Sequence, residues 1–502
     1  MGRPRGAPFG VAYSGAVSNG IRYIVLSDVH LGASNSILTE VDPQTGAVDP
    51  EHAGPALVAL VDCLHALVAG AAGAAAPVLV ADGDVIDLAL SPPEAAAPVF
   101  GQFLARMLAP GRPAIDHEVL LLPGNHDHIV WEYTREHWFE DHLVDAVSGA
   151  VDTPAVRRRI GPMWLDEKPR FDAPLLPLLV HRLTMLDDLR VRVLYPDLAL
   201  ASADGRRAVL VTHGHYIESV SKVMSGFLRM VVPQAPAPRD VETMEEENWP
   251  WLDFFFSSMT RSGRPGALIE SIYDVLQNEQ ALGRLIDTIA HNLTAKRGLV
   301  VGRAERMGIR YGIGSLLDIA ASSRERGITG EVLTDGTRQG LADYLVSLAR
   351  RLGERGSALP ADVSLVLGHT HKPFSEWWKD ASWPGGGLRV FNTGGWVVDH
   401  ATAQPLMGGA VALVSDELDV ALVRLYQQID DPAGWRISVE TVEPGPGGEA
   451  FAARLRAVVD DDGAPFAAFT RVAAARVGER RAALARILSS RIEQLGGESA
   501  TD

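Results

Sequence analysis

The sequence predicts a layered α/β sandwich interrupted by a helical segment, and three patterns lead to this fold class. Short apolar runs alternate with helical periodicity over the first 130 residues. Further apolar runs follow later in the chain, and helical periodicity dominates between residues 216 and 360. Because strand–helix–strand repeats favour parallel pairing with a crossover helix, the first part should form a mainly parallel sheet with helices packed on it.

The expected strands are short runs rich in β-branched and apolar residues. In the first part of the chain they span 21–27, 76–81 and 118–123, with helices expected at 55–70 and 97–109. The later strands are expected at 189–196, 207–212, 363–368, 388–394, 409–415 and 418–426. Since apolar and polar residues alternate in these later runs, we expect them to form an antiparallel second sheet.

The chain has 502 residues, more than one hydrophobic core usually fills, so we expect an elaborated domain. A flexible N-terminus over 1–20 should precede a sheet domain built from 21–215 and 361–445. A helical insertion or cap over 216–360 should divide that domain, and a helical tail over 446–502 should follow it. Within the insertion, 216–232 carries apolar residues at three- and four-residue steps, and 265–293 is also helical in pattern.

Charge and cysteine content restrict the setting of the protein. The formal net charge of −17 argues against nucleic acid as a partner, because an acidic surface repels phosphates at long range. No apolar run approaches the roughly 18 residues of a membrane span, and the basic N-terminus lacks the apolar core of a signal peptide. The single cysteine, Cys63, lies on the apolar face of the 55–70 helix, so we expect a buried thiol in a cytoplasmic protein.

Polar residues follow five of the expected strands at the point where each strand ends. They are Asp28 and His30, Asp84 and Asp87, Asn125 and His126, His213 and His215, and His369 and His371. Ligands of open α/β sheets bind outside the carboxyl ends of the strands, so these side chains should converge on one place.

Imidazole, carboxylate and amide groups together suit a site for two divalent metal ions. Two such ions lie about 3.5–4 Å apart when a ligand bridges them, and the two oxygens of Asp84 allow it to bridge. Asp28, His30 and His371 can complete one ion, and Asn125, His213 and His369 the other. Residues two apart in a strand face opposite sides, so the backbone must turn within each pair of ligands. We expect the neighbouring Gly32 and Gly368 to permit these turns.

The motifs DVH, GDVID, GNHD, HGH and GHTH, in this order, resemble the five blocks of the calcineurin-like metallophosphoesterases. The resemblance covers about residues 20–130, 205–216 and 362–400. It implies a four-layer sandwich of two mixed β-sheets flanked by helices, with 216–360 as a large helical insertion. The stretch LSDVHLG is also similar to the start of bacterial UDP-2,3-diacylglucosamine pyrophosphatases, although this chain is much longer than those enzymes.

The resemblance also implies a role for each site residue. The first metal would be held by Asp28, His30, Asp84 and His371, and the second by Asp84, Asn125, His213 and His369. His126 would be catalytic, contacting the phosphate and assisting the leaving oxygen, while a hydroxide bridging the metals attacks phosphorus in line. The metal implied first is Mn, with Fe, Zn and Ni as alternatives. Among the two block-four histidines we prefer His213 to His215 as the ligand, because His213 ends the strand.

Three further residues are expected to support the site. Asp87 should orient a histidine or the backbone from behind the ligands, and Asp127 should cap the GNHD turn and steady His126. Asn392, in the NTGGW segment at 392–396, should close the site together with its glycines.

These expectations define a metal-dependent phosphoric ester hydrolase that acts on a phosphomonoester, phosphodiester or pyrophosphate bond of a small-molecule or lipid-linked substrate. The alternatives are a nuclease and a non-catalytic metal-binding scaffold of the same fold. Asp28 or Asp84 alone could be a helix N-cap, but five ordered strand-end motifs argue for one shared site.

Two segments of the insertion have alternative interpretations. The aromatic segment 248–259 could be a lid over the substrate, a patch that touches a membrane, or the insertion's own core. The basic residues of 295–310 form either a solvated face or a phosphate clamp. The oligomeric state is left open.

Overall fold

The computed structural model describes residues 20–149, 159–172, 188–258 and 330–497, apart from 44, 74, 110, 169, 355–357, 444–447 and 462. The expected flexible N-terminus, except residue 20, and the expected helix at 265–293 therefore lie outside the described residues. The same is true of the basic segment 295–310. No helix in the described ranges is long and apolar enough to cross a membrane.

The larger of two β-sheets has eight strands in the order β13-β12-β11-β1-β2-β3-β5-β4. Its strands are β1 (Ile21–Leu26), β2 (Val78–Asp82), β3 (Glu118–Leu122), β4 (Phe171–Asp172), β5 (Arg190–Val193), β11 (Gln404–Ser415), β12 (Val420–Gln428) and β13 (Ser438–Glu440). The four strands β1, β2, β3 and β5 are parallel, as the alternation of strands and helices predicts. The remaining strands pair antiparallel, so the sheet is mixed.

The smaller sheet has five strands in the order β6-β7-β8-β10-β9. Its strands are β6 (Asp197–Ala201), β7 (Arg207–Thr212), β8 (Asp362–Leu367), β9 (Phe374–Lys379) and β10 (Gly387–Asn392). The middle three are parallel, and the two edge strands pair antiparallel with their neighbours. Two mixed sheets flanked by helices confirm the fold class that the sequence predicts.

The expectation that the later strands form an antiparallel second sheet is wrong. The core of the second sheet is parallel, and the last strands instead extend the first sheet, because β11 pairs antiparallel with β1. An apolar pattern reports which faces of a strand are buried, and it does not identify the neighbouring strand. The expected strand at 189–196 also divides, since β5 ends at Val193 in one sheet and β6 begins at Asp197 in the other.

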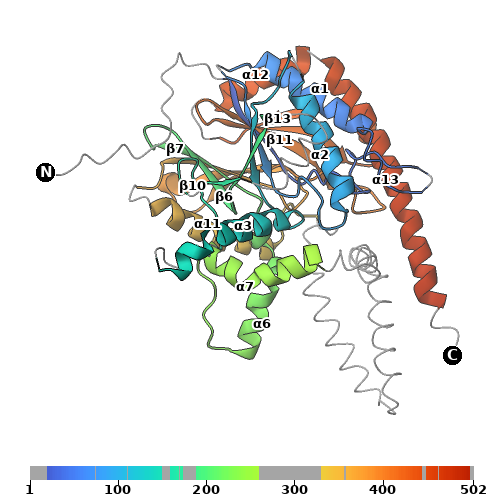
Figure 1. Cartoon of the computed structure of the whole chain (residues 1–502). Helices are drawn as coiled ribbons and strands as arrows, with labels where there is room; N and C mark the ends of the chain where they lie inside the picture. Colours follow the sequence, from blue (N-terminus) through green and yellow to red (C-terminus); the bar gives the residue numbers. More distant parts are fainter. Residues whose placement is uncertain are drawn as a thin grey trace.

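Helices cover the outer face of each sheet, which gives four layers (Figure 1). The eight-stranded sheet packs against α1 (Pro55–Gly70), α2 (Pro93–Met107), α12 (Gly448–Asp461) and α13 (Gly463–Gly497). The five-stranded sheet packs against α7 (Val241–Asp253) and α11 (Asp335–Gly353). In β1, Ile24 and Leu26 face the helices while Val25 faces the other sheet, so both faces of the strand are apolar.

The C-terminal stretch is helical, as expected, and it also contributes to the main core. Phe451, Leu455, Phe469 and Val477 of α12 and α13 are buried in the same hydrophobic cluster as α1 and α2. The two helices therefore complete the outer layer over the eight-stranded sheet.

The described part of the insertion begins with two 3-10 turns, η1 (His215–Ile217) and η2 (Ser219–Lys222). It continues with α6 (Val223–Val231), α7 and a π-helical turn, η3 (Phe254–Ser258). The expected helix over 216–232 is therefore α-helical only in its second half. In the aromatic segment, Leu252, Phe255 and Phe256 are buried in one core with the strands of the second sheet, so this part of the insertion packs against the sheet domain. Helix α3 (His128–Val147) lies beside this segment.

Candidate metal centre

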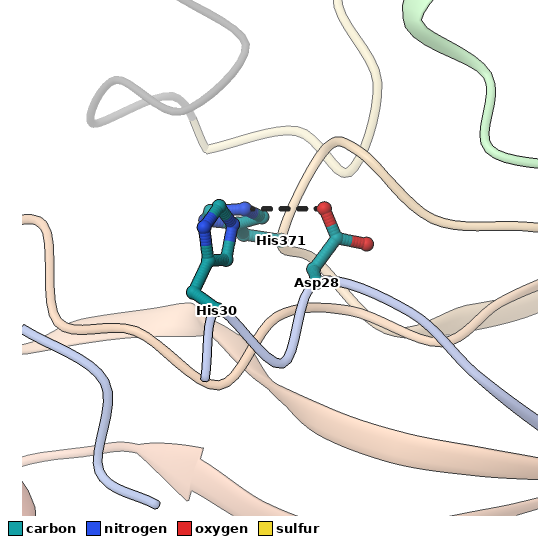
Figure 2. Close-up of side chains that lie close together, drawn as sticks. All are labelled: Asp28, His30 and His371. Atoms are coloured by element: carbon teal, nitrogen blue, oxygen red, sulfur yellow. Dashed lines mark ion pairs between the residues drawn. The ribbon is translucent and has the colours of Figure 1, made fainter. Parts of the chain in front are cut away.

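The polar residues at the five strand ends converge at one edge of the sandwich. Asp28, His30 and His371 form one group, whose candidate ligand atoms all lie within 4.8 Å of one another. Figure 2 shows the Asp28 carboxylate and the two imidazole rings close together, with His371 Nε2 at 3.3 Å from Asp28 Oδ1. Asp84, His213 and His369 form a second group on the same criterion.

Asp84 joins the two groups. Its Oδ2 lies 3.8 Å from His30 Nε2 on one side and 3.4 Å from His213 Nε2 on the other. Its Oδ1 accepts a hydrogen bond of 2.7 Å from the backbone N–H of His126. One carboxylate is thereby held between both donor sets, which is the position a bridging ligand requires.

The hydrogen bonding of these groups fits the presence of cations. Among the described residues, Asp28 Oδ1, His30 Nε2, Asp84 Oδ2 and His371 Nε2 are buried without a hydrogen-bond partner. Unsatisfied buried polar atoms are costly, so four of them facing one centre indicate a ligand that would satisfy them. Carboxylate and imidazole donors suit divalent transition metals, and the site therefore fits two such ions.

Carboxylates lie behind two of the candidate ligand histidines. Asp87 Oδ2 is 2.9 Å from Nδ1 of His30, and Asp399 Oδ2 is 2.9 Å from Nδ1 of His371. A partner on Nδ1 fixes the ring and directs Nε2 toward the centre, an arrangement typical of metal-binding histidines. Asp87 is where the sequence predicts a supporting residue. Sequence reasoning missed Asp399, which follows the NTGGW segment but belongs to none of the five motifs.

At the site, the residues that adopt the turn conformation are the candidate ligands themselves. Asp28, His30, Asp84, His369 and His371 all have positive φ, between 48° and 68°. Such values are uncommon outside glycine and asparagine, and they allow residues two apart to face the same side.

The glycines expected to make these turns contribute differently. Gly32 does have a positive φ of 95°, but no positive φ is found at Gly368. A Cβ at Gly368 would overlap the Asp28 carboxylate and the Ser27 side chain. Gly368 is therefore required for the close approach of the two loops, and the expectation that it makes the turn is wrong.

The GNHD segment is held by its own aspartate. Asp127 Oδ1 accepts hydrogen bonds from the backbone N–H of Gly124 at 2.6 Å and of Asp84 at 3.2 Å. The side chain makes no capping bond to α3, so it holds the turn rather than the helix. Asn125 Oδ1 lies 3.2 Å from His213 Nε2, which adds a neutral oxygen to the second group.

His126 lies beside the first group, and its ring also forms a group with His30 and Asp84, whose candidate ligand atoms lie within 4.8 Å of one another. Its Nδ1 is 3.2 Å from Asp87 Oδ2, the same oxygen that contacts His30. Its ring lies edge-on to His30, with centroids 4.6 Å apart, and 5.4 Å from the ring of Phe256. One carboxylate therefore orients both imidazoles, and an aromatic ring from the insertion covers His126.

In the metal-free site, burial and the charges of neighbouring groups shift the pKa values of the carboxylates and imidazoles. Burial raises the pKa of Asp28, but His213 and His371 outweigh burial and lower it to about 2. Burial lowers the pKa of His213, but Asp84 and Asp28 outweigh burial and raise it to about 10. The pKa of Asp127 rises to about 6 because of burial and the nearby charge of Asp84. In the absence of a metal, the His213 imidazolium therefore supplies positive charge to the second group.

The second histidine of the HGH motif lies outside both groups. His215 Nε2 is 3.4 Å from the hydroxyl of Tyr195, and burial, followed by repulsion from His213, holds its pKa well below its usual value. The structure thus brings His213, and not His215, to the centre.

Asn392 supports the GHTH loop from the end of β10. Its amide nitrogen donates to the carbonyl of Gly368 at 2.8 Å and to Thr370 Oγ1 at 3.1 Å. Its Oδ1 accepts from the N–H of Gly394 at 2.8 Å. The NTGGW segment therefore holds the loop that carries His369 and His371.

Comparison with known proteins gives similarity at the level of solved structures. No family model matches the chain, and no curated protein matches it either. The chain is similar to the crystal structure of a dimetal phosphatase from Danio rerio, with a TM-score of 0.27 and 10% sequence identity. The match covers 80% of this chain and 94% of the phosphatase.

Proposed function

We propose that this protein is a dinuclear metal-dependent hydrolase of phosphoric esters. The observation that carries the proposal is the Asp84 carboxylate held between two donor groups, with unsatisfied ligand atoms facing it. The five ordered motifs that resemble the calcineurin-like metallophosphoesterases supply the same residues. Fold and donor chemistry together thus favour phosphoester hydrolysis over a structural metal site, because a structural site needs only one ion.

The proposed ligands follow from the two groups. One ion would be held by Asp28, His30, Asp84 and His371, and the other by Asp84, Asn125, His213 and His369. When bound, two divalent ions lower the pKa of a water molecule and stabilise the charge of the phosphate oxygens. Mn is the first candidate, with Fe, Zn and Ni as alternatives that the same donors accept.

His126 is the proposed catalytic residue of the chain itself. Because Asp87 lies at Nδ1, the ring is oriented so that Nε2 would face a bound phosphate ester. Positioned there, His126 would donate a hydrogen bond or a proton to the oxygen that leaves phosphorus. The Phe256 ring beside it would exclude water from the leaving side.

The proposed substrate is a small-molecule or lipid-linked phosphate ester. The bond can be a phosphomonoester, a phosphodiester or a pyrophosphate, as in nucleotide sugars of the UDP-2,3-diacylglucosamine type. The net charge of −17 disfavours a nucleic acid substrate.

A substrate panel with added Mn²⁺ tests the proposal. It should contain an aryl phosphate, a bis-aryl phosphate, a nucleotide sugar, a cyclic nucleotide and single-stranded DNA. We expect hydrolysis of at least one small ester, and loss of both metal and turnover in Asp84→Asn. Asp62→Asn is a matched control, because Asp62 is exposed on α1, in the outer helical layer, and belongs to neither donor group. Full metal content and turnover in Asp84→Asn, or a wild-type protein that binds metal but hydrolyses no ester, would contradict the proposal.

A further inference from the structure

One carboxylate at the centre comes from the insertion and belongs to none of the five motifs. Glu218 lies between η1 and η2, and its Oε2 is 3.2 Å from Nε2 of His369. Both side chains are almost fully buried, with exposed fractions of 2% and 3%. His369 belongs to the second group, together with Asp84 and His213. Glu218 thus contacts a proposed ligand from outside the sheet domain.

The orientation of His369 differs from that of the other three histidines. In each of the others, the acceptor lies on Nδ1: Asp87 on His30, Asp399 on His371, and the carbonyl of Asp82 on His213. Each of these rings therefore directs Nε2 toward the other donors. In His369 the carboxylate of Glu218 lies at Nε2 instead. Among the described residues, the second group contains Asp84, His213 and His369 but not Glu218, so the carboxylate lies behind the histidine and not among the candidate ligand atoms.

The insertion fixes the backbone on both sides of Glu218. On one side, Gly340 of α11 packs so closely against Ile217 that a Cβ there would overlap the Ile217 carbonyl. On the other side, the indole N–H of Trp251 in α7 donates to the carbonyl of Val220 at 3.0 Å. Two helices thus hold the turn that carries Glu218, and its carboxylate is placed before any ion binds.

We propose that Glu218 is a positioning residue for the second metal ion. Its carboxylate, 3.2 Å from Nε2, would fix the orientation of the His369 ring toward the ion shared with Asp84 and His213. The insertion then contributes to metal affinity as well as covering the site. This inference rests on the proposed function only in requiring that two ions bind.

Titration of the metal-free, full-length protein with Mn²⁺ tests this role without measuring activity. We expect Glu218→Ala to weaken one of two sites by about 10–100-fold and to leave the other unchanged, as is usual when a partner behind a ligand histidine is removed. Glu218→Gln keeps a hydrogen-bond acceptor of the same size, so it should retain most of the affinity. Glu242→Gln is the control, because Glu242 is an exposed glutamate of the insertion, in the first turn of α7. Thermal unfolding of each metal-free variant checks that the fold is kept.

The outcomes separate the possibilities. Unchanged affinity in both Glu218 variants would overturn the inference. Equal losses in Glu218→Gln and Glu218→Ala would also overturn it, since they would make Glu218 a direct ligand whose charge is essential. A wild-type protein that binds two ions but hydrolyses no ester would contradict the proposed function alone.

Discussion

Metal binding should release a proton from His213, and the resulting pH dependence can be worked out from the structure. In the metal-free protein the nearby carboxylates of Asp84 and Asp28 overcome the effect of burial and raise the pKa of His213 to about 10. Nδ1 of this ring lies 3.1 Å from the carbonyl of Asp82, so it keeps its proton. The proton that an ion must displace is therefore the one on Nε2, which faces Asp84 and Asn125.

The sign follows from competition between the proton and the ion. Below its pKa the imidazole is protonated, so raising the pH removes the competitor and strengthens metal binding. Each pH unit below about 10 changes the fraction of neutral imidazole by about tenfold, which corresponds to about 1.4 kcal/mol. Between about pH 6 and pH 8 the affinity of the second site should therefore rise by about 100-fold.

Isothermal titration with Mn²⁺ in two buffers of different ionisation enthalpy measures both the affinity and the protons released. We expect about one proton released per ion at the second site near neutral pH. His213→Asn is the matched variant, because it replaces the imidazole with a neutral oxygen donor, as Asn125 provides, and it should bind more weakly with a flatter pH dependence. An affinity independent of pH in the wild-type protein, or no proton release, would refute the reasoning.

Three further predictions concern individual parts of the site. His126→Ala should keep both ions and lose about 10²–10⁴-fold in kcat, as steady-state kinetics and metal analysis would show, and unchanged turnover would exclude His126 from catalysis. Asp399→Ala should weaken the affinity for the ion at the His371 site by about 10–100-fold, and Asp399→Asn should weaken it less. Mn²⁺ titration measures both affinities, and wild-type affinity in Asp399→Ala would contradict the prediction. Removing metal with EDTA should lower Tm, because each site at 100 times its Kd stabilises the folded state by about 2.7 kcal/mol, and equal Tm values with and without Mn²⁺ would argue against tight binding.

The sequence predicts the centre of the site better than its surroundings, for a physical reason. His213 and Asp84 lie within two residues of the ends of apolar strands, and parallel strands bring their carboxyl ends to one edge. Asp399 and Glu218 lie in irregular segments with no fixed distance from a strand end, so no local pattern indicates where their side chains point. The packing of α7 and α11, which lie outside the motifs in the sequence, holds the turn that carries Glu218.

Sheet membership was hard to predict for a related reason. The strand β11 is buried on both faces, and its apolar pattern would suit the centre of either sheet. Its pairing with β1 depends on where the chain returns after the second sheet is complete, which is a long-range property of the fold.

The positive φ values of the proposed ligands explain how neighbouring ligands in one motif can serve one centre. A left-handed conformation costs about 1–2 kcal/mol for a residue with a side chain, and five residues of the site adopt it. Hydrogen bonds between the loops offset this cost: the N–H of His30 donates to the carbonyl of Asp84 at 2.8 Å, and the N–H of His369 donates to Asp28 Oδ2 at 2.8 Å. Because each loop holds another, the ligands are in place before an ion arrives, and little of the binding energy is lost in reorganising them. The strained backbone is therefore held by the surrounding fold and does not depend on a bound ion. This is why residue types that rarely adopt positive φ can do so together at a single site.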